Sequence, residues 1–174
     1  MQGKTLVKRI TFLAAFSAVA IILGYVEALL PINFGIPGVK LGIANLVTVI
    51  MLTSDNFGFK FMDIIIVCLV RIITVGFLFG NMYGIIYSLC GGLFSLIIMY
   101  IFNRLHVLGT LGISIVGGIF HNIGQLLVAM FVVKELKIIY YAPVLLLSGS
   151  ITGCLVGLLS GLVLLRLNGI KIDD

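Results

Sequence analysis

The chain has 174 residues, of which 61% are hydrophobic and only 10% are charged, and its mean hydropathy is +1.32. A soluble domain carries roughly 25% charged residues, and a core of this size cannot bury so much apolar surface. The composition therefore excludes a soluble domain and predicts one integral membrane domain over residues 1–174. The net charge of +5 is typical of basic cytoplasmic loops, so we expect no nucleic-acid partner.

Six apolar segments are candidates to cross the bilayer, which requires roughly 20 residues of helix. In chain order they cover about residues 10–30, 39–53, 61–79, 83–102, 108–133 and 143–165. The first follows Lys4, Lys8 and Arg9, as in a secretory signal peptide, but its apolar run continues to Leu30, which favours a retained helix. The second is short, which leaves a thin span or a re-entrant segment as alternatives.

The basic residues predict the orientation of this all-α bundle of six transmembrane helices. With six spans, most Lys and Arg residues lie on the side of both termini, whereas the opposite side holds only Lys40, Lys134 and Lys137. Basic residues concentrate on cytoplasmic loops. We therefore expect a multi-pass protein of the cell membrane with both termini in the cytoplasm.

Small residues repeat at four-residue spacing on two of the predicted helices. Such faces allow a second helix to approach closely. On the last helix we interpret the repeat as packing inside the bundle, with contact to a partner protein as the alternative. The residues are Gly149, Gly153, Gly157 and Gly161 on the last helix, and Ala14 and Ala18 on the first.

Polar side chains inside the apolar segments gather in the half of the bilayer opposite the termini, as a rise of 1.5 Å per residue indicates. Polar groups are expensive in hydrocarbon and face the bundle interior, so we expect a cavity open to the outside. Ligand contact and contacts between helices, such as a pair between Arg71 and Glu27, both remain open. The candidate residues are Glu27, Lys40, Asn45, Arg71, Asn81, Tyr87, His121, Asn122 and Gln125.

The motifs of several enzyme classes are missing from the sequence. There is no P-loop and no aspartate-rich cluster to hold Mg²⁺ against a diphosphate. The three cysteines form no CxxC pair. The two histidines, His106 and His121, fall in opposite halves of the membrane, which argues against a bis-histidine haem site or a zinc site within one chain. We expect no metal, no cofactor and no catalysis by this chain alone.

Four features occur in an order that resembles a known membrane family. They are PGVKLGIAN at residues 37–45, the intramembrane Arg71, Tyr87-Ser88 before Gly91-Gly92, and HNIGQ at residues 121–125. Together they resemble the family called "Gx transporter" or "heptaprenyl diphosphate synthase component I", from about Leu13 to Leu165.

The transporter name implies similarity to the substrate-binding S components of energy-coupling factor transporters. Those proteins are six-helix bundles that capture a vitamin or similar nutrient near the outer face. Their first helix docks through an AxxxA face onto a transmembrane coupling subunit, and separate ATPases drive transport. Here Ala14 and Ala18 match that face, and residues 31–38 would form the lid over the site. Arg71 and Lys40 would then hold an anionic group of a small-molecule substrate.

In an S-component-like protein, the remaining polar residues would complete the substrate-binding site. His121, Asn122 and Gln125 would supply directional hydrogen bonds, and Asn45, Asn81 and Tyr87 would line the mouth. Glu27 lies near the outer surface and belongs to the same set of candidates.

The synthase name implies a different role for the chain. It would be a non-catalytic accessory subunit of a polyprenyl diphosphate synthase in quinone biosynthesis, and similar proteins are also linked to quinone- and flavin-dependent electron export. The partner would then be the synthase or electron-transfer proteins, and the pocket would hold a lipid tail. A vitamin, a flavin, a porphyrin and a prenyl compound all stay open as ligands.

Overall fold

The computed structural model describes residues 2–29, 42–54 and 57–168. Within those ranges every regular element is a helix: α1 (Gln2–Leu29), α2 (Asn45–Thr53), α3 (Phe61–Phe79), α4 (Met82–Arg104), α5 (Thr110–Val133), the 3₁₀ helix η1 (Leu136–Tyr141) and α6 (Ala142–Asn168). Five helices are long and apolar enough to cross a membrane. The prediction of an all-helical, multi-pass membrane protein is therefore confirmed.

The second predicted span differs from the structure in its length. Helix α2 has 9 residues, which corresponds to about 14 Å, roughly half of the hydrocarbon core. The chain enters it through a turn in which Asn45 N donates to Gly42 O at 2.8 Å. Gly42 has φ +70°, a left-handed conformation that favours glycine. Among the described residues of the predicted second span, residues 42–44 precede the helix and only 45–53 are helical. A bundle of six full spans is not confirmed.

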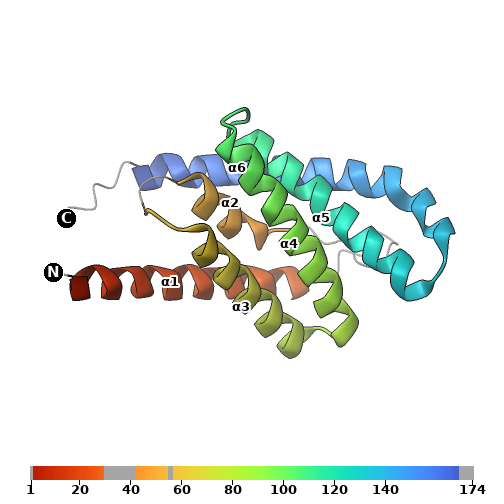
Figure 1. Cartoon of the computed structure of the whole chain (residues 1–174), viewed down its shortest axis with the longest axis horizontal. Helices are drawn as coiled ribbons and strands as arrows, with labels where there is room; N and C mark the ends of the chain where they lie inside the picture. Colours follow the sequence, from red (N-terminus) through yellow and green to blue (C-terminus); the bar gives the residue numbers. More distant parts are fainter. Residues whose placement is uncertain (1, 30–41, 55–56, 169–174) are drawn as a thin grey trace.

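The helices alternate in direction (Figure 1). Helices α1, α3 and α5 run from left to right in that view, and α2, α4 and α6 run from right to left. Although α2 is short, α3 begins on the side of the molecule where α1 begins. The amino end of α1 and the carboxyl end of α6 consequently lie on the same side.

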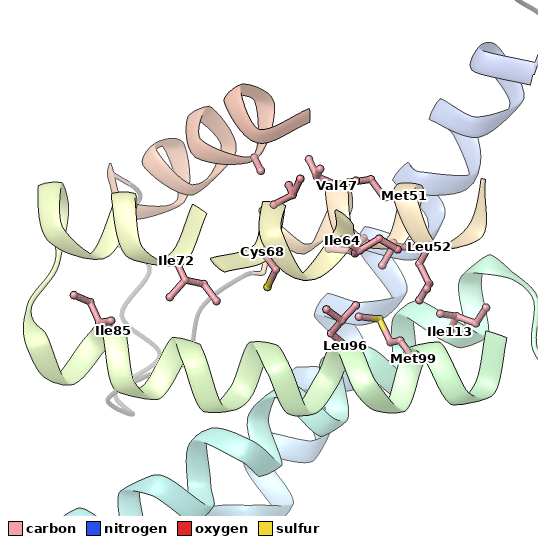
Figure 2. Packing of buried hydrophobic residues seen from close by; sticks show 14 residues of the cluster. Val47, Met51, Leu52, Ile64, Cys68, Ile72, Ile85, Leu96, Met99 and Ile113 are labelled. Atoms are coloured by element: carbon pink, nitrogen blue, oxygen red, sulfur yellow. The ribbon is translucent and has the colours of Figure 1, made fainter. Parts of the chain in front are cut away.

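The main apolar core lies between α2, α3 and α4 (Figure 2). Buried residues on α3 recur every three or four positions, which places them on one face of the helix. The same spacing on α4 presents Leu96 and Met99 to that face. The labelled core residues are Val47, Met51, Leu52, Ile64, Cys68, Ile72, Ile85, Leu96, Met99 and Ile113.

Helices α5 and α6 pack with their backbones in contact. A side chain added at Gly153 would lie 2.7 Å from Ser114 O, and one added at Gly149 would lie 2.9 Å from the Gly118 carbonyl carbon. Gly157 approaches Leu111 of α5 in the same way, whereas Gly161 has no atom within 4 Å of that position. Three of the four repeated glycines of α6 thus form a contact inside the bundle, as the packing interpretation predicts.

Helix α1 is attached differently, through side chains of α3. Arg9 Nη2 lies 2.6 Å from Asp63 Oδ1 and 2.7 Å from Asp63 Oδ2, and Gly24 allows Val75 to approach closely. The opposite face of α1 is exposed along its length. Its residues include Val7, Ile10, Ala14, Ala18, Val19, Ile22, Val26 and Leu29.

Candidate ligand-binding site

A buried arginine is the most unusual group in the bundle. Arg71 lies on the core face of α3, three residues after Cys68, and only 7% of its surface is exposed. Its Nη1 donates to Asn45 Oδ1 at 3.2 Å, and its Nη2 lies 3.9 Å from Cys68 Sγ, a weak acceptor. Its Nε has no hydrogen-bond partner in the part of the chain that the structure describes. Among the described residues, this permanent positive charge therefore has only neutral hydrogen-bond partners.

Glu27 has a role that the sequence did not indicate. Its Oε1 accepts a hydrogen bond from Gly42 N at 2.6 Å, and its Oε2 accepts one from Ala44 N at 3.5 Å. Backbone N–H groups at the start of a helix attract a carboxylate because they carry a partial positive charge. Glu27 thus joins the end of α1 to the start of α2. Among the described residues it forms no ion pair with Arg71, which contacts Asn45 instead.

A narrow cleft lies beside Asn45. Its walls come from four helices, and about 20 Å³ of it is open to the centre of a water molecule. Since one water needs roughly 10–15 Å³ by this measure, the cleft admits one or two waters in this conformation. The lining residues are Gly42, Asn45, Val49, Ser95, Met99, Ser114, Gly117, Gly118, Thr152, Gly153 and Val156.

The Gly91–Gly92 pair of α4 brings polar groups of α3 and α5 close to its backbone. A side chain added at Gly92 would lie 3.9 Å from Arg71 Nη2. One added at Gly91 would lie 2.9 Å from Gln125 Cγ and 3.3 Å from His121 Cε1. Gln125 is only 5% exposed, and its Nε2 has no hydrogen-bond partner within the described ranges. The two glycines therefore make room for the polar groups predicted on two different helices.

Two of the predicted residues, Asn122 and Asn81, form hydrogen bonds to backbone atoms. Asn122 Nδ2 donates to Leu145 O at 2.7 Å and so joins α5 to α6. Asn81 is exposed and caps α4, where its Oδ1 accepts from Gly84 N at 2.7 Å. Tyr87 is half-buried on α4. Asn122 and Asn81 thus satisfy structural hydrogen bonds in this conformation.

Lys40 and the predicted lid at residues 31–38 lie outside the described residues. Ala14 and Ala18 lie on the exposed face of α1, where no helix of the described chain covers them.

Three residues near the site were not among the candidates from the sequence: Cys68, Ser95 and Ser114. Cys68 lies three residues before Arg71, which places both on one face of α3. Ser95 and Ser114 line the cleft, and their hydroxyls donate to Gly117 O and Gly153 O, each at 2.7 Å. Ser95 lies four residues after Gly91 and therefore on the same face of α4. This spacing could have indicated from the sequence that Ser95 lies near the site.

The polar groups of the candidate site can bind a ligand through hydrogen bonds. Its buried groups are a guanidinium, amides and hydroxyls, and within the described residues no three His, Cys, Asp or Glu side chains are placed to hold a metal. The strongest interaction that these groups can offer is a charge-assisted hydrogen bond to an anion.

Comparison with known proteins identifies the class of this membrane protein. The family model for heptaprenyl diphosphate synthase component I matches residues 16–163. The chain belongs to that family. No curated protein and no solved structure matches it.

Proposed function

We propose that this chain is the substrate-binding membrane subunit of an ATP-driven importer of the energy-coupling factor type. It would bind a small anionic molecule at Arg71. The observation that carries the proposal is the environment of this side chain, which is 7% exposed and has no carboxylate partner among the described residues. Burying an unpaired charge costs several kcal/mol. A bound anion would offset that cost, so its binding within the membrane would be favourable.

The proposed topology has six passes and both termini in the cytoplasm. The alternating directions of the helices support it, because α3 starts on the side where α1 starts. Helix α2 would then lie in the second pass. The side of the molecule that holds Lys8, Arg9, Arg104 and Arg166 would face the cytoplasm, in agreement with the positive-inside rule.

The exposed face of α1 would dock onto a coupling subunit. Ala14 and Ala18 lie four residues apart on this face, and small residues let helices approach within a membrane. ATPase subunits bound to that partner would supply the energy. The chain itself would carry out no catalytic step.

Purification in detergent followed by mass spectrometry of co-purified small molecules tests the binding role. We expect an anionic molecule on the wild-type protein and at least a tenfold lower occupancy on Arg71→Gln. The control is Arg166→Gln, which removes the same charge from an exposed position in the last turn of α6. Equal occupancy in wild type and Arg71→Gln would contradict the proposal.

Co-purification tests the docking face separately. We expect coupling and ATPase subunits to accompany the wild-type chain and to be lost from the double variant Ala14→Leu, Ala18→Leu. The matched control is Gly161→Leu, because a side chain there meets no atom within 4 Å. A complex that persists in the double variant would count against docking through α1.

A second candidate is an accessory subunit of a polyprenyl diphosphate synthase. The name of the family, heptaprenyl diphosphate synthase component I, favours it. In that case the molecule found by mass spectrometry would be a prenyl diphosphate or a prenyl quinone, and a synthase would co-purify in place of ATPases.

A further inference from the structure

We infer that Asn45 and Glu27 are positioning residues for Arg71, and that together they fix the orientation in which its guanidinium meets a ligand. The inference rests on the proposed binding role of Arg71 and adds two residues that act on the ligand through it. A continuous series of hydrogen bonds supports it. The series runs from α1, through the turn before α2, to the buried face of α3.

The series begins at the carboxylate of Glu27 on α1. Its Oε1 accepts a hydrogen bond from Gly42 N at 2.6 Å, and its Oε2 accepts one from Ala44 N at 3.5 Å. The carbonyl oxygen of Gly42 accepts in turn from Asn45 N at 2.8 Å. Glu27 therefore holds the turn that leads into α2, and with it the backbone of Asn45.

The same turn limits the side chain of Asn45, which in turn holds Arg71. A Cβ at Gly42 would lie 3.5 Å from Asn45 Nδ2, so the amide packs against the turn. Asn45 Oδ1 accepts from Arg71 Nη1 at 3.2 Å, and Arg71 Nη2 lies 3.9 Å from Cys68 Sγ. Because a guanidinium is planar, contacts at both terminal nitrogens fix the direction of the whole group.

A guanidinium with a fixed orientation binds an anion more tightly than a mobile one, because ordering a side chain during binding costs free energy. Asn45 supplies this order without cancelling the charge, since its amide is neutral. An acidic residue in its place would orient Arg71 as well, but it would compensate the charge within the fold. The neutral partner thus leaves the positive charge available to a ligand.

The side chain of Arg71 can be observed directly by NMR, because the chain contains only four arginines, at positions 9, 71, 104 and 166. Protein labelled with ¹⁵N-arginine is washed in detergent to remove bound compounds, and lysine variants of the other three arginines assign the signals of Arg71. We expect separate Nη signals in the wild type and one averaged signal in Asn45→Leu, where the guanidinium can rotate. An averaged signal in the wild type, or separate signals in Asn45→Leu, would overturn the inference.

The matched control for this measurement is Asn81→Leu. Asn81 Oδ1 accepts from Gly84 N at 2.7 Å within the first turn of α4, so the variant also loses a structural hydrogen bond. Its melting temperature should fall, whereas its Arg71 signals should match those of the wild type. If the Arg71 signals in Asn81→Leu average as they do in Asn45→Leu, the effect is general loosening of the bundle and the inference fails.

Glu27→Ala tests the first step of the series, and it also serves if Asn45→Leu does not fold. Without the carboxylate the turn before α2 loses its acceptor, so the Nη signals of Arg71 should move towards the average. Glu27→Gln, which keeps one acceptor oxygen, should restore the separate signals. Arg71 signals in Glu27→Ala that equal those of the wild type would overturn the role of Glu27.

Asn45→Asp separates the positioning of Arg71 from the binding of a ligand. It keeps an acceptor oxygen for Arg71 Nη1, so the Nη signals should stay separate. Its negative charge compensates the guanidinium, so the anion that co-purifies with the wild type should fall about tenfold or more in mass spectrometry. Averaged Nη signals in this variant would overturn the inference. Separate signals with undiminished anion would contradict the proposed binding role while the positioning of Arg71 stands.

Asn45→Leu should weaken binding less than Arg71→Gln does, because it keeps the positive charge. We expect the co-purified anion to fall by about three- to tenfold, which corresponds to the loss of one hydrogen bond. Wild-type occupancy in Asn45→Leu would show that the orientation of Arg71 does not affect binding, and would overturn the inference.

Discussion

Two helix pairs in this bundle are held together by different means. Helices α5 and α6 meet through glycines, with backbone carbonyls such as Ser114 O and Gly118 O at the contact. Helices α1 and α3 meet through side chains, with the Arg9–Asp63 ion pair near their amino ends and Val75 against Gly24. Backbone contact fixes one spacing and register, whereas side chains can adjust their rotamers. We therefore describe the α5–α6 pair as the rigid frame of the bundle, and the contact of α1 with α3 as the more adjustable one.

The largest effect is expected from adding a side chain at the glycine contact. In Gly153→Leu the new Cβ would lie 2.7 Å from Ser114 O and 2.8 Å from Ile115 Cα, so α6 must move away from α5. We expect a loss of about 3 kcal/mol or more, which lowers the melting temperature by roughly 6–12 °C. Gly161→Leu, on the same helix with open space, should melt within about 2 °C of wild type. Similar melting of both variants would refute the rigid-frame description.

A smaller effect is expected where α1 meets α2. Glu27→Ala removes the acceptor of Gly42 N and Ala44 N, and a hydrogen bond to a charged group contributes about 1.5–3 kcal/mol. We expect a loss of about 2 kcal/mol in unfolding measurements, and a smaller loss for Glu27→Gln, which keeps one acceptor oxygen. If both variants melt as the wild type does, the carboxylate does not hold α2.

The ion pair between α1 and α3 should contribute less. The Arg9 side chain is 40% exposed, while that of Asp63 is 4% exposed, so water can solvate the arginine when its partner is removed. A double-mutant cycle of Arg9→Ala and Asp63→Ala should give a coupling free energy of about 1 kcal/mol. A coupling of zero would show that packing alone holds this end of α1.

The smallest effect concerns a single hydrogen bond within the rigid pair. Ser114→Ala removes the donor to Gly153 O and leaves the glycine contact unchanged. Hydrogen bonds between membrane helices contribute about 0.6 kcal/mol on average, so the melting temperature should fall by only about 1–2 °C. A loss as large as that of Gly153→Leu would show that polar bonds, and not backbone packing, hold α5 against α6.

The sequence predicted the long helices well because hydropathy reports how many apolar residues follow one another. The predicted range 61–79 coincides with α3. The sequence did not predict where α2 begins. Gly42 is compatible both with an apolar helix and with a left-handed turn, and the sequence pattern does not distinguish between them; in the structure its φ is +70°.

The sequence also predicted the candidate site only in part. The sequence placed Arg71 and Gln125 inside the bundle, and both are buried. Whether Arg71 meets Glu27 or Asn45 depends on how α1, α2 and α3 pack, and no spacing within one helix contains that information. The sequence grouped Asn122 with Gln125, whereas in the structure Asn122 Nδ2 donates to Leu145 O of α6, a contact that depends on how α5 and α6 pack.

The glycine contact also bears on the order of assembly. Freezing side-chain rotamers opposes association, and glycine has no rotamers to lose. Gly149 and Gly153 meet α5 largely through backbone atoms, so this contact forms with little loss of side-chain entropy. The short connection through η1 keeps the two helices adjacent in the chain. Residues 110–168 should therefore associate as a helical hairpin soon after they enter the bilayer. Helices α2 and α4 would then pack against this hairpin.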